Sequence, residues 1–478
     1  MKYFGAFARR TKIVCTIGPA SSSTVVIRQL IKEGMNIARF NLSHGTHNDH
    51  TDYIKRVRKI SRQLKINVSI LIDIPGPKYR TGILKESKAL LNEGALVVLT
   101  TRPVEGDDSL VPVNFPYFSK EIHVGDTVLL DDGAMQLKVL SKVGSEVRCR
   151  VVVGGVLTNG RGLVVPGMRT TGHYVTDSLK QHLFYAIQEK PDYLALSFVS
   201  NADDVAQVRQ ITEENGADIS IIAKIERGVA VHNFDRILAA SDSIMVARGD
   251  LGVDIPLERV PIVQKEIIRK CNQAGKPVIT ATQMLESMVT SFNPTRAEVT
   301  DVANAIFDGT DATMLSGETS VGKYPMQAVK IMAKIAQEIE SELSYDKVLA
   351  EKRNWLERKT EELISYNACL TAQSLGAAAI VAFTDSGSTA ARVSKFRPGV
   401  PILAISSSDV VCGRLLLWWG VYPFQIVEPA SVDELFTTAA ALTKKLGLAT
   451  PNDIIVITGG IPLGVAGSTN LLKVEKIT

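Results

Sequence analysis

The chain of 478 residues has few cysteines, and no two of them are closely spaced. The five are Cys15, Cys149, Cys271, Cys369 and Cys412. An odd, dispersed set predicts reduced thiols and excludes a disulfide framework or a CxxC-type zinc site. No apolar run reaches the roughly 18 residues of a membrane span, and the N-terminal segment is too short and polar for a secretory leader. We therefore expect a soluble, cytoplasmic protein that does not bind membranes.

A strong net charge is also missing. Lys and Arg number 54 against 50 Asp and Glu, which gives a formal charge of +4. Such a small excess creates no long-range basic field, so a dedicated nucleic-acid binder is not expected. The 45% hydrophobic content is enough to bury a sizeable core, which excludes a disordered chain. The length predicts about three domains.

Short β-branched runs, each ending in a polar or glycine-rich cluster, recur along much of the sequence. They are residues 13–17, 36–40, 68–73, 193–197, 219–225, 243–247, 277–281 and 312–316. Segments with helical periodicity separate most of them, as at 22–34, 202–215 and 259–274. This α/β alternation predicts a closed (β/α)8 TIM barrel, with catalytic groups at the C-terminal ends of its strands. An open doubly wound sheet is the alternative, but no GxGxxG follows a strand.

Two segments break this alternation. Residues 77–174 show alternating strands at 126–130, 134–140 and 146–153 with glycine-containing turns, which predicts a small inserted antiparallel β-domain, expected to form a small β-barrel. Beyond residue 343, runs at 379–383, 400–405, 424–427 and 454–458 predict a C-terminal α/β domain. We therefore expect a barrel formed by residues 1–76 and 175–343, an inserted domain at 77–174, and a last domain at 344–478.

Polar residues follow the second and third predicted strands. Alternation places Arg39, Asn41 and Ser43 on one side of the chain. Asp73 ends the third strand, and a rigid Pro-Gly-Pro turn leads from it to Lys78 and Arg80. Guanidinium groups favour phosphate ligands, although a surface belt of salt bridges would give the same pattern.

The fifth and sixth strands carry the strongest signal. Lys224 and Glu226 share one face at the end of an apolar strand, where a lysine is costly unless it meets an anion. Asp250 lies between two glycines where a helix should begin, so free backbone N–H groups are expected there. Glu226 and Asp250 offer hard oxygen ligands for Mg²⁺, with coordination sites left for substrate and water. A Lys–Glu ion pair beside a turn aspartate is the alternative.

Hydroxyl groups follow the last two barrel strands. Thr282 follows the seventh strand, and Ser316 and Glu318 follow the eighth. These residues could position water or relay a proton, or serve only as helix caps. Cations, metal-binding carboxylates and few nucleophiles at one barrel mouth suit phosphoryl transfer, which needs positioning and charge neutralisation.

Three other features favour ordinary structural roles. His44, His47 and His50 are spaced by three residues, but no cysteine or carboxylate completes a metal-ligand set. The basic run at 55–59 is typical of a solvated helix face, without aromatics for base stacking. The pair Trp418 and Trp419 is expected in the core or at a subunit contact.

Taken together, these motifs resemble the pyruvate kinase family. The most specific stretches are 36–45, 222–226, 245–253 and 294–318, the last containing Asp308-Gly309-Thr310-Asp311. The resemblance implies transfer of the phosphoryl group of phosphoenolpyruvate to ADP, giving pyruvate and ATP in the last step of glycolysis. It also implies a homotetramer and an inserted domain that closes as a lid.

The resemblance assigns roles to residues by matching position. Lys224 would stabilise the migrating phosphoryl group, and Arg39 would bind the substrate phosphate. Glu226 and Asp250 would hold Mg²⁺ or Mn²⁺. The Gly249 and Asp250 amides and Thr282 would bind the substrate carboxylate. The nucleotide would be bound by Asn41, His44 and Arg80. Ser316 and Glu318 would relay a proton.

Two positions depart from the family pattern. Many relatives bind K⁺ through residues matching Asn41, Ser43, Asp73 and the Ile74 carbonyl, and carry Glu where Lys78 stands. Lys78 resembles the residue of a K⁺-independent group, so K⁺ is expected not to be required. Near Ser178 the family usually has a nucleotide-facing lysine, and Lys180 is a candidate substitute.

The C-terminal domain offers a candidate effector loop in Thr384, Ser386, Gly387, Ser388 and Thr389. Hydroxyls and glycine between a strand and a helix suit a phosphate, and a plain capped turn is the alternative. The family binds a sugar-phosphate effector there. Because the facing loop at 458–464 has no Arg or Lys, we expect a monophosphate such as AMP or a sugar monophosphate, not a bisphosphate.

Two other functions fit the sequence less well. One is another Mg²⁺-dependent barrel enzyme acting on phosphoenolpyruvate or a 2-oxo acid, which would need neither Arg80 nor a lid. The other is a regulatory binding protein that keeps the fold without turnover.

Overall fold

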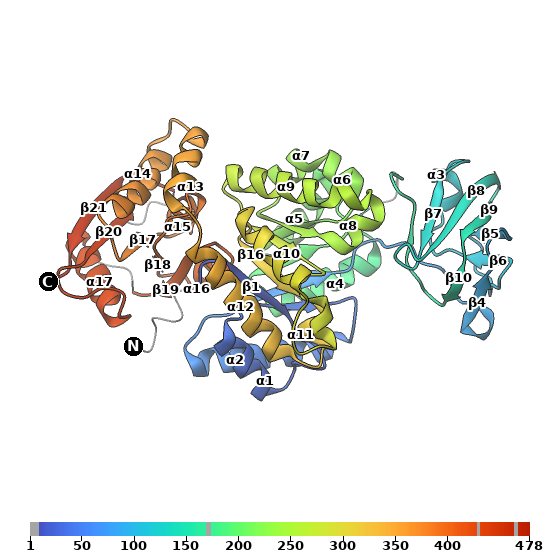
Figure 1. Ribbon diagram of the computed structural model, residues 1–478, viewed down its shortest axis with the longest axis horizontal. Helices are drawn as coiled ribbons and strands as arrows, with labels where there is room; N and C mark the ends of the chain where they lie inside the picture. The colour runs from blue at the N-terminus through green and yellow to red at the C-terminus, as the bar shows by residue number, and fades with distance from the viewer. Residues whose placement is uncertain (1–8, 169–173, 428–430, 463–466) are drawn as a thin grey trace.

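The computed structural model describes residues 9–168, 174–427, 431–462 and 467–478. Its three units follow one another along the long axis of the molecule (Figure 1). The barrel lies in the middle, the inserted β-domain at one end and the C-terminal domain at the other. No helix of these residues is long and apolar enough to cross a membrane.

The central unit is a closed barrel of parallel strands, as predicted. Its strands run in the order β1-β16-β15-β14-β13-β12-β3-β2 around the barrel. Their bounds are β1 (Lys12–Thr16), β2 (Ile37–Asn41), β3 (Ser69–Ile74), β12 (Tyr193–Leu196), β13 (Ser220–Ile225), β14 (Ser243–Ala247), β15 (Val278–Ala281) and β16 (Ala312–Leu315). Each lies within one residue of a predicted strand at both ends.

Helices surround the barrel and connect its strands. They are α1 (Thr24–Glu33), α2 (His47–Leu64), α4 (Asp177–Glu189), α5 (Ala202–Glu214), α6 (Gly228–His232), α7 (Phe234–Ala240), α8 (Arg248–Asp254), α9 (Val260–Ala274), α10 (Arg296–Phe307), α11 (Gly317–Ser320) and α12 (Pro325–Ser341), with short 3₁₀ turns η3 (Leu257–Arg259) and η4 (Glu286–Val289). Several begin with a reciprocal cap. In α2, for example, Asp49 N–H donates to the Thr46 hydroxyl and the Asp49 carboxylate accepts from Thr46 N–H.

The inserted domain has its own apolar core, which includes the fully buried Phe118 and Leu130. One sheet has the order β11-β7-β8-β9-β5-β6, and β10 pairs with β4. The elements are η2 (Lys85–Ser87), β4 (Lys88–Leu91), β5 (Leu96–Thr100), β6 (Leu110–Pro112), α3 (Phe118–Glu121), β7 (Thr127–Leu130), β8 (Met135–Val143), β9 (Glu146–Val153), β10 (Gly155–Thr158) and β11 (Leu163–Val164). The pair β5–β6 is parallel, which the antiparallel expectation did not include.

The C-terminal domain is an α/β sheet in the order β19-β18-β17-β20-β21. Its elements are α13 (Tyr345–Lys352), η5 (Arg353–Trp355), α14 (Thr360–Ser374), β17 (Ala379–Phe383), α15 (Ser388–Lys395), β18 (Ile402–Ser406), α16 (Asp409–Leu415), β19 (Val421–Gln425), α17 (Val432–Lys445), β20 (Ile454–Gly459) and β21 (Leu471–Lys476). The predicted strand at 424–427 is wrong in its bounds, since β19 runs from Val421 to Gln425. Pro423 obscured it, because proline is tolerated only on an edge strand such as this one. The antiparallel β21 was missed.

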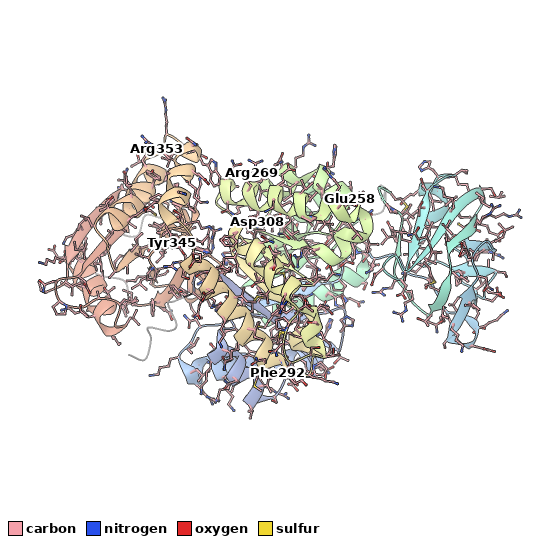
Figure 2. All side chains as sticks on the ribbon, in the orientation of Figure 1. Glu258, Arg269, Phe292, Asp308, Tyr345 and Arg353 are labelled. Atoms are coloured by element: carbon pink, nitrogen blue, oxygen red, sulfur yellow. The ribbon has the colours of Figure 1, made fainter. Side chains whose placement is uncertain are left out.

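The C-terminal domain closes the N-terminal end of the barrel. Leu417 is buried in the same apolar cluster as Val14 of β1 and its neighbour Ile37, the first residue of β2. Trp419 is buried as expected for a core residue. Figure 2 labels Tyr345 at this junction, where the Arg10 guanidinium lies 5.0 Å from the centre of its ring. The opposite, C-terminal end of the barrel faces the inserted domain.

Candidate active site at the mouth of the barrel

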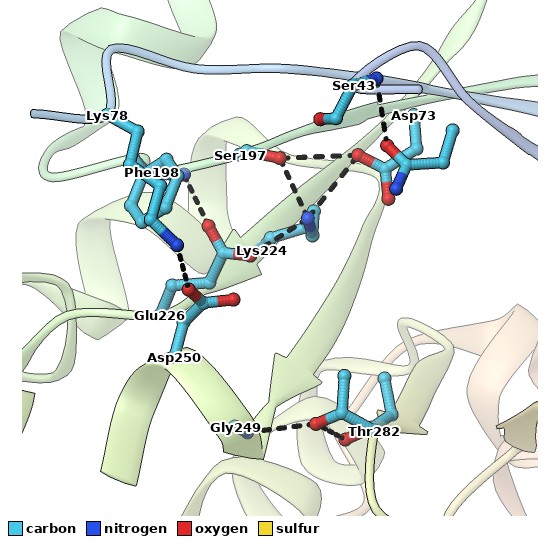
Figure 3. Close-up of polar contacts among 12 residues, drawn as sticks. Ser43, Asp73, Lys78, Ser197, Phe198, Lys224, Glu226, Gly249, Asp250 and Thr282 are labelled. Atoms are coloured by element: carbon cyan, nitrogen blue, oxygen red, sulfur yellow. Dashed lines mark hydrogen bonds and ion pairs between the residues drawn. The ribbon is translucent and has the colours of Figure 1, made fainter. Parts of the chain in front are cut away.

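A buried lysine lies at the centre of the barrel mouth. Lys224, on β13, has its Nζ 2.8 Å from Glu226 Oε1, 3.3 Å from Asp73 Oδ1 and 2.7 Å from Ser197 Oγ (Figure 3). Burial alone disfavours the ammonium, but the two carboxylates outweigh it and raise the pKa of Lys224. Lys224 is therefore charged, and its three contacts fix the position of the ammonium in the barrel mouth.

Arg39 and Asp73 form a second buried pair. Arg39 Nε donates to Asp73 Oδ2 at 2.8 Å, and Nη1 donates to Thr16 Oγ1 at the end of β1, also at 2.8 Å. Although burial raises the pKa of Asp73, the Lys224 and Arg39 charges outweigh it, and the net pKa lies below its ordinary value. Asp73 thus joins the two cations that the sequence assigned to the phosphate.

Glu226 and Asp250 occupy the other side of the lysine. Glu226 Oε2 accepts from the Phe198 backbone N–H at 2.6 Å. Burial is the main cause that raises the pKa of Glu226, and the nearby Asp250 adds to it. Asp250 Oδ1 lies 3.1 Å from Lys78 Nζ. A dication held by the two carboxylates would offset the Asp250 charge that contributes to the raised pKa of Glu226.

Both carboxylates line a pocket between the barrel mouth and the inserted domain. Its empty volume, counting space open to solvent, is about 440 Å³. Pro77, Lys78 and Met168 line it from the inserted-domain side. No group of three or more His, Cys, Asp or Glu able to hold a metal occurs among the described residues. Two carboxylates with room beside them nevertheless fit Mg²⁺, which takes few protein ligands and completes its shell with substrate oxygens and water.

The residues expected to bind K⁺ have protein partners here. Asn41 Oδ1 accepts from Ser43 N–H at 3.2 Å, and the Ile74 carbonyl accepts from Ser197 N–H at 3.3 Å. The Lys78 ammonium lies at the Asp250 side of the mouth, 3.6 Å from Asp132 of the inserted domain. Among the described residues its ion-pair partners are Asp132 and Asp250, and Asp73 is not one of them. Lys78 therefore links a predicted metal ligand to the inserted domain.

Thr282 is held in a left-handed conformation, with φ at 67°. Its Oγ1 accepts from Gly249 N–H at 2.9 Å, so the two groups expected at the substrate carboxylate are adjacent. Arg248 donates to the Thr282 carbonyl at 2.7 Å and to the Gln283 carbonyl at 3.1 Å. A β-branched residue at positive φ is strained, and Arg248 holds this backbone in place.

Ser316 and Glu318 lie at the end of β16. Glu318 accepts from Ser316 N–H at 2.7 Å and from Leu285 N–H at 3.0 Å, and burial raises its pKa. The buried Ser316 hydroxyl has no partner among the described residues. Glu318 thus shapes the loop that presents Ser316.

The expected nucleotide residues are more exposed. The His44 side chain is solvent-exposed, and its carbonyl accepts from His50 Nε2 at 2.7 Å. Arg80 donates to the Gly160 carbonyl of the inserted domain at 2.9 Å. Ser178 lies in the exposed first turn of α4, and Lys180 lies 3.8 Å from Asp177.

The expected effector loop precedes α15. Gly387 caps the helix at a φ of 89°, and Ser386 Oγ donates to Ser388 Oγ at 3.2 Å. Thr389 and Thr469 hydroxyls lie 2.9 Å apart, and the buried Thr384 hydroxyl has no partner among the described residues. Residues 463 and 464 of the facing loop lie outside the described residues.

Sequence reasoning missed Ser197, Phe198 and Arg248. Ser197 follows β12, so the strand-end rule could have found it. Phe198 has a positive φ of 57°, which aims its N–H at Glu226 and which no residue pattern signals. Arg248 is next to Gly249 in the sequence, but the sequence does not show that it contacts the loop after the seventh barrel strand.

Known proteins match this chain in sequence along nearly its whole length. Residues 8–329 match the pyruvate kinase barrel domain and residues 362–475 the pyruvate kinase alpha/beta domain. A pyruvate kinase of Clostridium acetobutylicum is 42% identical over 471 residues, covering 98% of this chain and all of the relative. One of Geobacillus stearothermophilus is 44% identical over 98% of this chain and 81% of its own length.

The fold also matches that of a solved structure. The crystal structure of a pyruvate kinase from Cryptosporidium parvum superposes with a TM-score of 0.95 at 34% identity, covering 99% of this chain and 97% of that one. Both domains of the family, the barrel domain and the C-terminal α/β domain, are therefore present. The chain belongs to the pyruvate kinase family.

Proposed function

We propose that this enzyme transfers the phosphoryl group of phosphoenolpyruvate to ADP, giving pyruvate and ATP. One observation carries the proposal: a charged, buried Lys224 fixed by Asp73, Ser197 and Glu226 beside a second carboxylate, Asp250. Phosphoryl transfer needs fixed positive charge around the migrating group more than it needs a nucleophile. We place the reaction at the last step of glycolysis, in the cytoplasm.

In the transfer step, the phosphorus–oxygen bond of phosphoenolpyruvate breaks while a terminal ADP oxygen bonds to the phosphorus. Lys224 donates to the equatorial oxygens of the migrating group, whose charge it neutralises. Arg39 binds the same phosphate, with its guanidinium oriented by Asp73 and Thr16. Because their carboxylate and hydroxyl partners are buried, neither cation needs to reorganise during transfer.

The substrate carboxylate binds at the start of α8. The Gly249 and Asp250 amides and the Thr282 hydroxyl converge there, and the Gly249–Thr282 contact supports their use as one site. Arg248 keeps Thr282 in position through its carbonyl. Fixing the carboxylate sets the orientation of the enol oxygen that leaves the phosphorus.

Transfer leaves the enolate of pyruvate, which must gain a proton at its methylene carbon. A role for Ser316 in this step is supported by its buried hydroxyl, which has no partner within the described part of the chain. Glu318 positions Ser316 through its backbone N–H. We assign the pair to the proton relay, with water as the source.

Glu226 and Asp250 would hold Mg²⁺ or Mn²⁺. An ion held by these carboxylates would neutralise phosphate and enolate charge and help to orient both substrates. Asn41, His44 and Arg80 bind the nucleotide, and closure of the inserted domain excludes water that would otherwise hydrolyse the phosphoryl donor. Lys78 supplies a fixed cation at Asp250, so we propose that K⁺ is not required.

The C-terminal loop from Thr384 to Thr389 is proposed to bind a phosphorylated effector, with AMP or a sugar monophosphate preferred. Arg392, one turn into α15, supports phosphate binding because its Nη1 lies 3.4 Å from the Thr469 hydroxyl, which contacts Thr389 of this loop. A homotetramer is proposed as the active assembly.

Pyruvate formation from phosphoenolpyruvate and Mg²⁺, assayed with and without ADP, tests the function. We expect pyruvate only when ADP is present, with one ATP formed for each pyruvate. Pyruvate or a phosphonate product without ADP would favour a different phosphoenolpyruvate enzyme. Binding of phosphoenolpyruvate without any turnover would favour a regulatory protein.

A further inference from the structure

The middle histidine of the spaced set has a partner that the sequence did not suggest. His47 Nε2, at the first residue of α2, lies 3.0 Å from His182 Nδ1 on α4. Their rings meet edge to face, with centroids 5.1 Å apart and an interplanar angle of 82°. Both side chains are half-buried. Two imidazole nitrogens therefore face one another at the surface seam between α2 and α4.

The neighbours hold these rings in place. The His47 ring stacks on Tyr185 at 4.1 Å with an interplanar angle of 1°. The Tyr185 hydroxyl lies 3.2 Å from Thr51 Oγ1, which also donates to Glu189. His47 and Thr51 lie one turn apart on α2, and Tyr185 lies on α4. The stack and the hydroxyl contact therefore join the two helices. Packing thus already restricts the His47 side chain, so binding a ligand there would cost little further side-chain entropy.

We propose that His47 and His182 form a chelating site for one divalent transition-metal ion, such as Zn²⁺, Co²⁺ or Ni²⁺, that bridges α2 and α4. Two nitrogens each about 2.0–2.1 Å from a tetrahedral zinc ion lie roughly 3.3 Å apart. In the present structure one of these nitrogens donates a hydrogen bond to the other at 3.0 Å. Metal binding moves that proton to the other nitrogen of its own ring and opens the separation by a few tenths of an ångström, so that both lone pairs face the ion. Water completes the coordination shell.

The chemistry of the pair separates this site from the barrel mouth. Imidazole suits Zn²⁺, Ni²⁺ and Cu²⁺, whereas Mg²⁺ prefers the carboxylate oxygens proposed to bind it. Ligation requires neutral rings, and burial together with the neighbouring His47 lowers the pKa of His182. Glu189 adds negative charge to the same seam through Thr51.

Co²⁺ titration of the full chain, in saturating Mg²⁺ to fill the carboxylate site, tests the proposal. We expect visible d–d absorption from one Co²⁺ per chain and a rise in Tm with added Zn²⁺. His182→Gln should weaken binding by more than the roughly 10- to 100-fold that loss of an outer-shell partner costs. His123→Asn is the matched control, because His123 is exposed on the inserted domain.

His47→Phe keeps the stacking ring on Tyr185 but removes the ligand nitrogen, so it tests the site even where His182→Gln unfolds. This variant should also lose the Co²⁺ spectrum and the Zn²⁺-dependent rise in Tm. Equal binding by the wild type and both variants, or no binding by the wild type, would overturn the proposal. Neither result depends on the catalytic activity.

Discussion

The Lys224 ammonium and the Glu226 carboxylate form a buried ion pair, with Nζ 2.8 Å from Oε1. Asp73 completes the arrangement at 3.3 Å from Lys224 and also pairs with Arg39, so two buried cations balance two buried acids. Removing one partner of such a group leaves uncompensated charge, which is costly in a buried site. The lysine therefore has a structural and a catalytic role at once.

Replacing Lys224 with methionine should lower kcat by about 10³-fold or more, since it removes the main cation at the migrating phosphoryl group. Steady-state kinetics would measure it, with Lys55→Met on the exposed face of α2 as the control. A kcat within tenfold of the wild type would contradict the assigned role.

The cation at Lys78 predicts independence from K⁺. Activity should be the same in K⁺ and in tetramethylammonium, because the Lys78 ammonium, 3.1 Å from Asp250, already supplies a fixed positive charge at the barrel mouth. Lys78→Glu should make turnover depend on added K⁺. Initial rates in the two salts at equal ionic strength provide the measurement, and a large loss of wild-type activity without K⁺ would refute the prediction.

Arg248 should act as a positioning residue for Thr282. In Arg248→Lys the forked contacts to the Thr282 and Gln283 carbonyls are lost, and the strained backbone relaxes. We expect kcat/KM for phosphoenolpyruvate to fall roughly 10- to 100-fold, with the change mainly in KM. An unchanged KM would show that Thr282 holds its conformation without this guanidinium.

Asp192 should make the fold less stable at neutral pH than it would be with a neutral side chain. Burial raises the pKa of Asp192 to about 6, while its carboxylate accepts from Ile70 N–H at 2.7 Å. A folded pKa above the unfolded value means that stability falls as pH rises from about 4 to 6. Asp192→Asn keeps an acceptor for Ile70 and should gain about 1–3 kcal/mol at pH 8. Urea unfolding at pH 4 and pH 8 would test it, since the gain must shrink at the lower pH.

The effector loop gives a fifth prediction. Removing both hydroxyls in Ser386→Ala/Ser388→Ala should abolish activation by a sugar monophosphate or AMP, because a phosphate would lose two donors near the Gly387 cap. The ratio of activated to basal rates is the measurement. Activation that survives in the double variant would place the effector elsewhere.

Much of the fold followed from local patterns. Each barrel strand is a short apolar run with its polar residues directly after it, so both the strands and the gathering of Lys224, Glu226 and Asp250 were predictable. The edge strands were harder. Pro423 hid the start of β19, and β21 alternates only partly buried residues, so neither has the uniform apolar pattern of a central strand.

Contacts between segments far apart in the chain could not be predicted from the sequence. His47 and His182 are 135 residues apart, and only the packing of α2 on α4 brings their rings together. The positive φ at Phe198 and Thr282 likewise depends on tertiary partners, since neither residue type favours that conformation. Such positions lie where tertiary structure overrides local preference.

The most direct test of the central claim is ³¹P NMR of phosphoenolpyruvate mixed with ADP and Mg²⁺ in the presence of the enzyme. The phosphoenolpyruvate resonance should be replaced by the γ-phosphate resonance of ATP, and Lys224→Met should leave it almost unchanged over the same time. Release of inorganic phosphate without ATP, or equal transfer by the variant, would contradict phosphoryl transfer to ADP at this site.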